Sequence, residues 1–201
     1  PKGRVIKGWD LDAPDPAPRP IAAVDGAGAW VMGLAFSPDG CCLATACVEL
    51  GKAGRTSTSV WHIQTGAEIL SVPITEASDA VAFTPDGKLL ATASRDARIR
   101  IWQPAGAELP DLLAKPGEAA PRAGAPAGRK PGSIDWNKRI LAGHYDRVRH
   151  IDVSPDGALI ASAGADQTAK IWDTETGENL LTLTGHRGFV ESIKFHPDGR
   201  H

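Results

Sequence analysis

The sequence predicts an all-β repeat protein in which each unit is a four-stranded antiparallel sheet. The first observation is a Pro-Asp-Gly turn that occurs four times, within residues 37–40, 84–87, 154–157 and 196–199. Proline presets φ, aspartate can bond the backbone two residues on, and glycine accepts positive φ, so each copy favours a hairpin. The second observation is the period: once two insertions are subtracted, successive turns lie 41 or 42 residues apart.

Short β-rich runs on either side of the turns predict the first two strands of each unit. First strands are expected at 31–36, 80–83, 148–153 and 190–195, and second strands at 42–46, 88–93 and 158–163. In the first strands the apolar positions slip by one residue, as in Val148, Ile151 and Val153. This slip predicts a β-bulge near the strand start.

A third strand ends in an aliphatic residue followed by tryptophan: Val60-Trp61, Ile101-Trp102 and Ile171-Trp172. The distance from turn proline to tryptophan is 17 residues after Pro85 and Pro155 but 23 after Pro38, so the first full unit carries six extra residues. Fourth strands are expected at 67–72, 138–141 and 178–183, and Gly143-His144 and Gly185-His186 follow two of them.

These elements divide the chain into three full units, at 26–73, 74–142 and 143–184, and two partial ones. Residues 1–25 supply a third and a fourth strand, and residues 185–201 begin a further unit. Open ends of this kind predict either missing units from a longer chain or self-association through unpaired strand edges. The alternative is that both end pieces combine into one fourth unit.

The segment 103–132 interrupts the second full unit and differs in composition from the rest of the chain. Of its 30 residues, 19 are Ala, Pro or Gly. Such a stretch has little apolar surface to offset its ordering entropy, so we expect a flexible loop between the third and fourth strands. The simpler interpretation is a tolerated surface insertion; the other is a loop that docks a partner.

The period, the four strands per unit and the paired Gly-His and Trp-Asp signatures resemble the WD-repeat β-propeller family, most strongly over residues 143–173. The resemblance implies four-stranded blades around a central channel, here about three complete blades with partial blades at both ends, as in a fragment of a larger propeller. The near-consensus repeats and the Ala-, Pro- and Gly-rich loops look like those of bacterial members.

The same resemblance implies a structural tetrad of His144, Ser162, Asp166 and Trp172. Although Ser, His and Asp are also the residues of a hydrolytic triad, family geometry turns the serine toward an indole rather than toward a substrate. The second full unit keeps only Thr92, Asp96 and Trp102, with Ile74 at the histidine position. In the first, Gly51 and Arg55 stand at the serine and aspartate positions.

Similarity to the family also implies a face that binds partners. Its candidate residues combine aromatic, methionine and arginine side chains, as protein-binding hot spots do: Trp30, Met32, Asp79, Arg95, Arg147, Arg149, Phe189 and Glu191.

The composition sets limits on other functions. The formal charge of −2 gives no electrostatic argument for nucleic acid or a membrane surface. Cys41, Cys42 and Cys47 are too few and too close for a zinc site or a disulfide framework, which favours a reducing, cytoplasmic compartment. The histidines His62, His150, His196 and His201 show no metal-ligand spacing, so neither a metal nor another cofactor is expected.

We therefore expect a non-enzymatic propeller that acts as a scaffold for a protein or peptide partner. One alternative is the regulatory or substrate-recruiting propeller of a multidomain bacterial kinase or NTPase. Another is a propeller enzyme that uses the central channel, for which no acid pair, metal ligands or nucleophile stands out.

Overall fold

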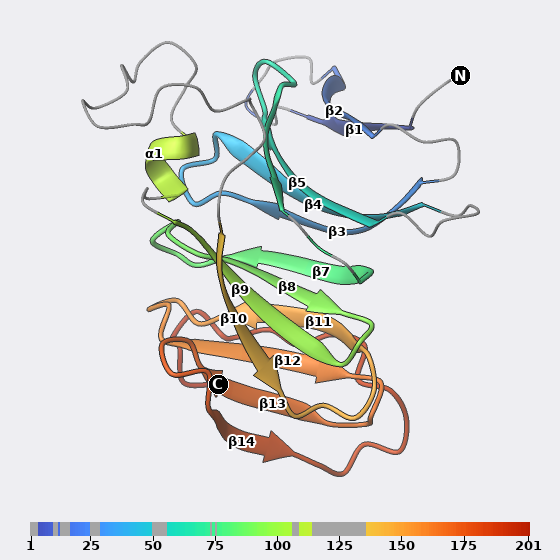
Figure 1. Cartoon of the computed structure of the whole chain (residues 1–201), viewed down its shortest axis with the longest axis vertical. Coiled ribbons are helices and arrows are strands. Elements are labelled where there is room, and N and C mark those ends of the chain that lie inside the picture. Colours follow the sequence, from blue (N-terminus) through green and yellow to red (C-terminus); the bar gives the residue numbers. More distant parts are fainter. Residues whose placement is uncertain are drawn as a thin grey trace.

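The computed structural model describes residues 4–9, 12, 17–24, 29–49, 56–72, 74, 76–105, 109–113 and 136–201. Three four-stranded antiparallel sheets follow one another along the long axis of the molecule (Figure 1). The first contains β3 (Ala29–Phe36), β4 (Cys42–Glu49), β5 (Thr56–His62) and β6 (Glu68–Val72). The second contains β7 (Ser78–Phe83), β8 (Leu90–Ser94), β9 (Arg98–Pro104) and β10 (Trp136–Ala142), and the third β11 (Val148–Val153), β12 (Leu159–Gly164), β13 (Ala169–Asp173) and β14 (Asn179–Leu183).

Each sheet is a meander in which every strand pairs with the next one in sequence, so the predicted all-β fold class is confirmed. The first strands pack beside one another, β3 against β7 and β7 against β11, as the inner strands of propeller blades do. The molecule is a partial β-propeller.

The Pro-Asp-Gly turns are built alike. In the first, the Ser37 hydroxyl donates to Asp39 Oδ1, which also accepts the Cys41 N–H at 3.0 Å, and Gly40 has a φ of 70°. The turns that contain Asp86 and Asp156 repeat these contacts, with Thr84 and Ser154 as the hydroxyl donors. We call the end of the sheets that carries these turns the turn end, and the opposite end the loop end.

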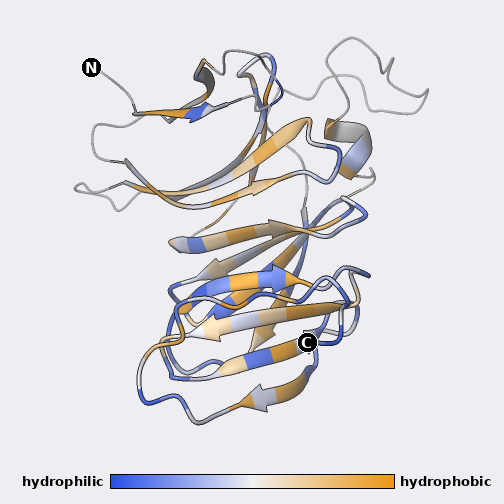
Figure 2. Ribbon diagram, turned by 180° about the vertical axis from the view of Figure 1, so that it is seen from behind, coloured by the Kyte–Doolittle hydropathy of each residue, from blue (hydrophilic) through white to orange (hydrophobic). Residues whose placement is uncertain are grey.

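Apolar side chains fill the space between neighbouring sheets, and Figure 2 shows apolar colouring along the strands and hydrophilic colouring in many turns. Val60 and Leu70 of the first sheet meet Phe83 and Trp102 of the second in one core cluster. A second cluster lies between the second and third sheets. The bulges predicted in β3 and β11 are confirmed by register shifts at Met32 and Arg149. A further shift occurs at Asp79 in β7, whereas the pattern at Val190 lies in a segment that forms no strand.

The expectation of a wholly flexible segment 103–132 was wrong. Gln103 and Pro104 pair with β10, and residues Leu109–Leu113 form a short helix, α1. Leu109 and Leu113 are 0% and 2% exposed and belong to the core between the first two sheets. The high content of Ala, Pro and Gly in this segment does not show that it also contains leucines whose burial stabilises the fold. The rest of the segment, residues 106–108 and 114–132, lies outside the described residues.

The two ends of the chain also differ in part from expectation. β1 (Arg4–Gly8) and β2 (Arg19–Val24) form a separate two-stranded sheet. Residues 190–195 lie against the third sheet but form no strand, because no segment among the described residues supplies a partner ladder. The described parts of the two end pieces do not pair with each other, which contradicts the alternative of one joint fourth blade. Among the described helices, none is long and apolar enough to cross a membrane.

Candidate interaction surface

The tetrad of the third sheet is a continuous hydrogen-bonded chain. Trp172 Nε1 donates to Ser162 Oγ at 2.8 Å, Ser162 Oγ lies 2.7 Å from His144 Nε2, and His144 Nδ1 lies 2.8 Å from Asp166 Oδ2. Ser162 is fully buried. Burial lowers the pKa of His144 although Asp166 acts in the opposite direction, so the ring is neutral at pH 7 and accepts from Ser162. The serine hydroxyl therefore faces an indole and an imidazole rather than a substrate.

Gly164 is part of this arrangement, although the sequence analysis did not identify it. A Cβ atom at this position would lie 2.4 Å from Asp166 Oδ1 and 2.5 Å from His144 Nδ1. In the second sheet Ser94 occupies the equivalent position opposite Ser78, and there the histidine is replaced by Ile74. The glycine and the histidine thus occur together for a steric reason.

The hydroxyl and the indole are kept in both of the other sheets, and the second sheet also keeps the aspartate, Asp96. Trp102 Nε1 donates to Thr92 Oγ1 at 2.9 Å, and Trp61 Nε1 donates to Thr45 Oγ1 at 3.0 Å. The assignment of Gly51 to this position was wrong, because the six extra residues lie between β4 and β5 and backward counting from Trp61 crosses them. Gly51 and Arg55 themselves lie outside the described residues.

Asp96 of the second sheet has a partner that the sequence analysis missed. The buried Arg100 donates to it through both terminal nitrogens, NH1 at 3.1 Å, so in this sheet a guanidinium rather than an imidazole pairs with the aspartate. This sheet does not depend on apolar packing alone.

The residues expected on the partner face lie at the loop end of the sheets: in β3, β7 and β11 or directly before β11, directly after β8, and in the segment after β14. Trp30 and Met32 are 50% and 40% exposed on β3, and Phe189 is 56% exposed. Arg149 connects β11 to the next segment: its NH1 donates to Glu191 at 2.7 Å, and its Cζ lies 4.7 Å from the centre of the Phe189 ring.

Asp79 lies beneath two arginines of this face and is buried. Its Oδ1 accepts from Arg95 Nε at 2.9 Å, and its Oδ2 lies 3.8 Å from Arg147 Nε. Arg95 follows β8 of the same sheet, whereas Arg147 precedes β11 of the next sheet. The carboxylate therefore joins two neighbouring units.

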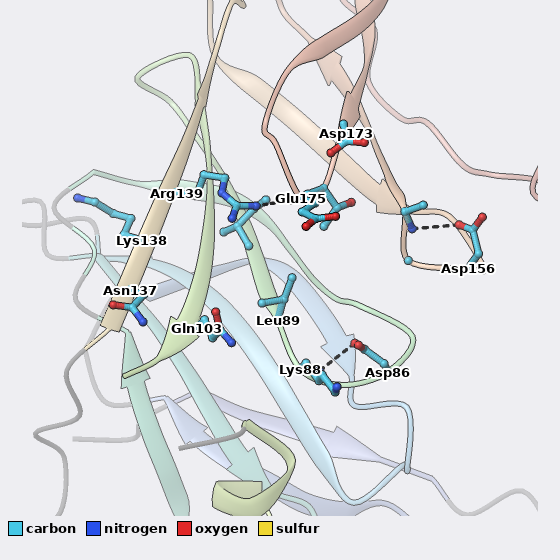
Figure 3. Close-up of a pocket in the computed structure, with 14 residues that line it drawn as sticks. Asp86, Lys88, Leu89, Gln103, Asn137, Lys138, Arg139, Asp156, Asp173 and Glu175 are labelled. Atoms are coloured by element: carbon cyan, nitrogen blue, oxygen red, sulfur yellow. Dashed lines mark hydrogen bonds between the residues drawn. The ribbon is translucent and has the colours of Figure 1, made fainter. Parts of the chain in front are cut away.

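A polar cleft of about 770 Å³ opens at the turn end between the second and third sheets (Figure 3). Lys138 and Arg139 of β10 line one side, the carboxylates Asp86, Asp156 and Glu175 come from turns of both sheets, and Asp173 comes from the end of β13. The Ser154 hydroxyl and the Ala158 N–H hold the pKa of Asp156 below its ordinary value, so this acid stays ionised. None of the predicted site residues lines the cleft. The cleft forms between two packed sheets, and a sequence pattern within one unit does not reveal it.

Two further groups concern the expectation of no metal. His196 Nδ1 and His201 Nδ1 lie 3.1 and 3.0 Å from Asp198 Oδ2. The structure therefore brings together three side chains that could bind a metal, although their spacing in the sequence is not typical of metal ligands. All three are exposed, and the Asp198 carboxylate accounts for the position of both rings. Cys41, Cys42 and Cys47 are free thiols, and burial raises the pKa of Cys42 to about 11, which makes it a poor metal ligand.

The family model described as "WD domain, G-beta repeat" matches residues 18–49, 76–103, 136–173 and 177–201. A subunit of chromatin assembly factor 1 from Mus musculus is 28% identical over 163 residues, covering 76% of this chain and 27% of the relative. Coronin-7 of Homo sapiens is 29% identical over 158 residues (77% and 14%), and Protein hir1 of Emericella nidulans is 30% identical over 176 residues (82% and 16%). The chain thus spans less than a third of each of these relatives, and because all three are eukaryotic they do not support the expected likeness to bacterial members.

Proposed function

The chain belongs to the WD40-repeat family, and from this premise we propose that it is a protein-protein interaction scaffold whose partner docks on the loop end of the sheets. One observation carries the proposal. Exposed Trp30, Met32 and Phe189 lie at the same end as three arginines whose positions are fixed by ion pairs. Aromatic, methionine and arginine side chains on a rigid support are the usual composition of a binding hot spot.

The relatives support a role in assemblies. One of them is by name a component of an assembly factor. The buried Ser162 supports a scaffold over a hydrolase, because its hydroxyl is enclosed between Trp172 and His144.

A second candidate function is that the propeller is one domain of a longer protein and recruits the substrate of that protein or regulates its activity. It is supported by the small share of each relative that the chain covers, 14% for coronin-7. Attachment to a bacterial kinase or NTPase has no support among these relatives. A cytoplasmic location is part of the proposal and rests on the three free thiols; imaging of a fluorescent fusion tests it.

The experiment compares partner capture by the tagged chain and by a Trp30→Ser/Phe189→Ser variant, followed by binding measurements with the purified partner. Loss of two hot-spot rings should weaken binding at least about tenfold. Ile140→Ser is the matched control, since Ile140 is an exposed apolar residue of β10 outside the proposed face. Equal affinity of the wild type and the double variant would rule out this face as the docking site.

A further inference from the structure

Arg95 and Arg147 share one carboxylate in an unusual way. Both point the Nε edge of the guanidinium toward Asp79, at 2.9 Å from Oδ1 and 3.8 Å from Oδ2. Their side chains are 37% and 33% exposed, whereas that of Asp79 is 6% exposed. The buried acid therefore positions two partly exposed arginines from neighbouring units.

The terminal amino groups of these two arginines remain available for a ligand. Within the described part of the chain, neither group hydrogen-bonds to an acceptor. Two buried or half-buried arginines of the same sheets differ: Arg100 uses both terminal nitrogens on Asp96, and Arg149 uses NH1 on Glu191. A planar guanidinium whose terminal nitrogens are unoccupied is suited to bind an oxyanion through two parallel hydrogen bonds.

The charge of the group indicates which oxyanion fits. Two guanidinium groups and one carboxylate have a net charge of +1, which a single carboxylate neutralises. A phosphate monoester carries about −1.5 to −2 at pH 7 and would place excess negative charge above the buried Asp79. A carboxylate therefore matches the group better than a phosphate.

We propose that Arg95 and Arg147 bind the carboxylate of an aspartate or glutamate in an acidic peptide segment of the partner, with Asp79 holding both arginines in place. This inference rests on the proposed scaffold function, because it assigns the chemistry recognised at one point of the same face.

The test uses the whole ¹⁵N-labelled chain and observes the Nε–H resonances of Arg95 and Arg147. The probe is a blocked glycine pentapeptide with one central glutamate; the same peptide with glutamine or with phosphoserine serves for comparison. Saturable shifts of both resonances with the glutamate peptide alone are expected. Arg147→Gln should weaken binding about tenfold, and Arg147→Lys should give an intermediate loss because the charge remains but the planar group is gone.

Lys88→Gln is the control, since it removes one positive charge at the turn end. Arg147 is the preferred site of substitution because its contact with Asp79 is the looser one, and an unchanged melting temperature shows that the variant folds. Absence of shifts, equal shifts with the glutamine peptide, tighter binding of the phosphoserine peptide or an unaltered Arg147→Gln variant would each overturn the inference. If partner capture depends on Trp30 and Phe189 while the glutamate peptide gives no shift, the scaffold proposal stands and only this inference fails.

Discussion

The hydroxyl and indole pair is the part of the tetrad that all three sheets retain. Trp61, Trp102 and Trp172 each donate to a Thr or Ser on the neighbouring strand, at 3.0, 2.9 and 2.8 Å. An indole N–H between packed sheets needs an acceptor, since an unpaired buried donor costs about 1–3 kcal/mol. The histidine and aspartate positions vary more, and in the second sheet the aspartate is paired with Arg100 of the third strand instead of a histidine.

Replacement of His144 by alanine should lower the free energy of unfolding by about 1–3 kcal/mol, because Ser162 and Asp166 each lose a buried partner. Chemical denaturation measures the change. His186→Ala is the control, since His186 follows the equivalent glycine of the next unit and is exposed. Equal losses in both variants would show that the buried network contributes nothing specific.

The same histidine makes stability depend on pH. Burial lowers the folded-state pKa of His144 below the ordinary value of 6.5, so below that pH the unfolded chain binds a proton that the folded chain resists. The contribution is complete above about pH 6.5 and is lost as the pH falls toward the folded-state pKa. Denaturation between pH 7 and 5 should give a steeper loss for the wild type than for His144→Ala. His150, whose pKa is also lowered by burial, affects both proteins alike, so parallel curves would exclude a role of His144.

At the scale of elements, local signals predicted what depends on local chemistry. The Pro-Asp-Gly turns and the alternation of apolar residues located the strands of all three sheets, and the slipped pattern located the bulges at Met32 and Arg149. What depends on distant partners was missed. Residues 190–195 have strand composition but no ladder, and α1 is stabilised by a core formed from two sheets rather than by its own five residues.

The candidate site residues also divide into those that local spacing predicts and those that depend on contacts between distant segments. The spacing of four residues matches a known repeat and predicted that they form one group: His144, Ser162, Asp166 and Trp172. In the structure they form a chain of hydrogen bonds. The sequence pattern did not indicate Arg100, Gly164 or the cleft at the turn end. Those features arise from side-chain reach across a hairpin and from the packing of one sheet on the next.

The helix α1 should therefore contribute to stability despite the composition around it. Leu109→Ala and Leu113→Ala should each cost about 2–5 kcal/mol, the range for truncation of a buried leucine. Thermal melts of the two variants measure this cost, and Leu180→Ala, which truncates an exposed leucine of β14, is the control. Melting temperatures equal to that of the wild type would mean that the leucines of the helix do not pack in the core.

At the scale of the whole molecule, the arc of sheets leaves apolar surface at both of its ends. Leu34 and Phe36 of β3 are exposed although their counterparts in β7 and β11 pack against a preceding sheet. Leu180, Leu181 and Leu183 are exposed along β14, which has a strand neighbour on one side only. Neighbouring sheets thus cover the interior of the stack, whereas the two outer faces are covered only in part, by Ile6 of β1 on the first sheet and by residues 190–195 on the third.

Such faces should make the isolated chain associate as its concentration rises, because an unpaired strand edge with apolar side chains is a template for another chain. Light scattering over a concentration series should show a mean mass above that of one chain. Phe36→Lys and Leu181→Lys should shift the mass back toward the monomer by placing a charge on each face. Tyr145→Lys is the matched control, since Tyr145 is an exposed aromatic residue in the loop before β11, away from both faces. A wild type that stays monomeric throughout, or lysine variants that associate as strongly as the control, would show that these faces do not drive association.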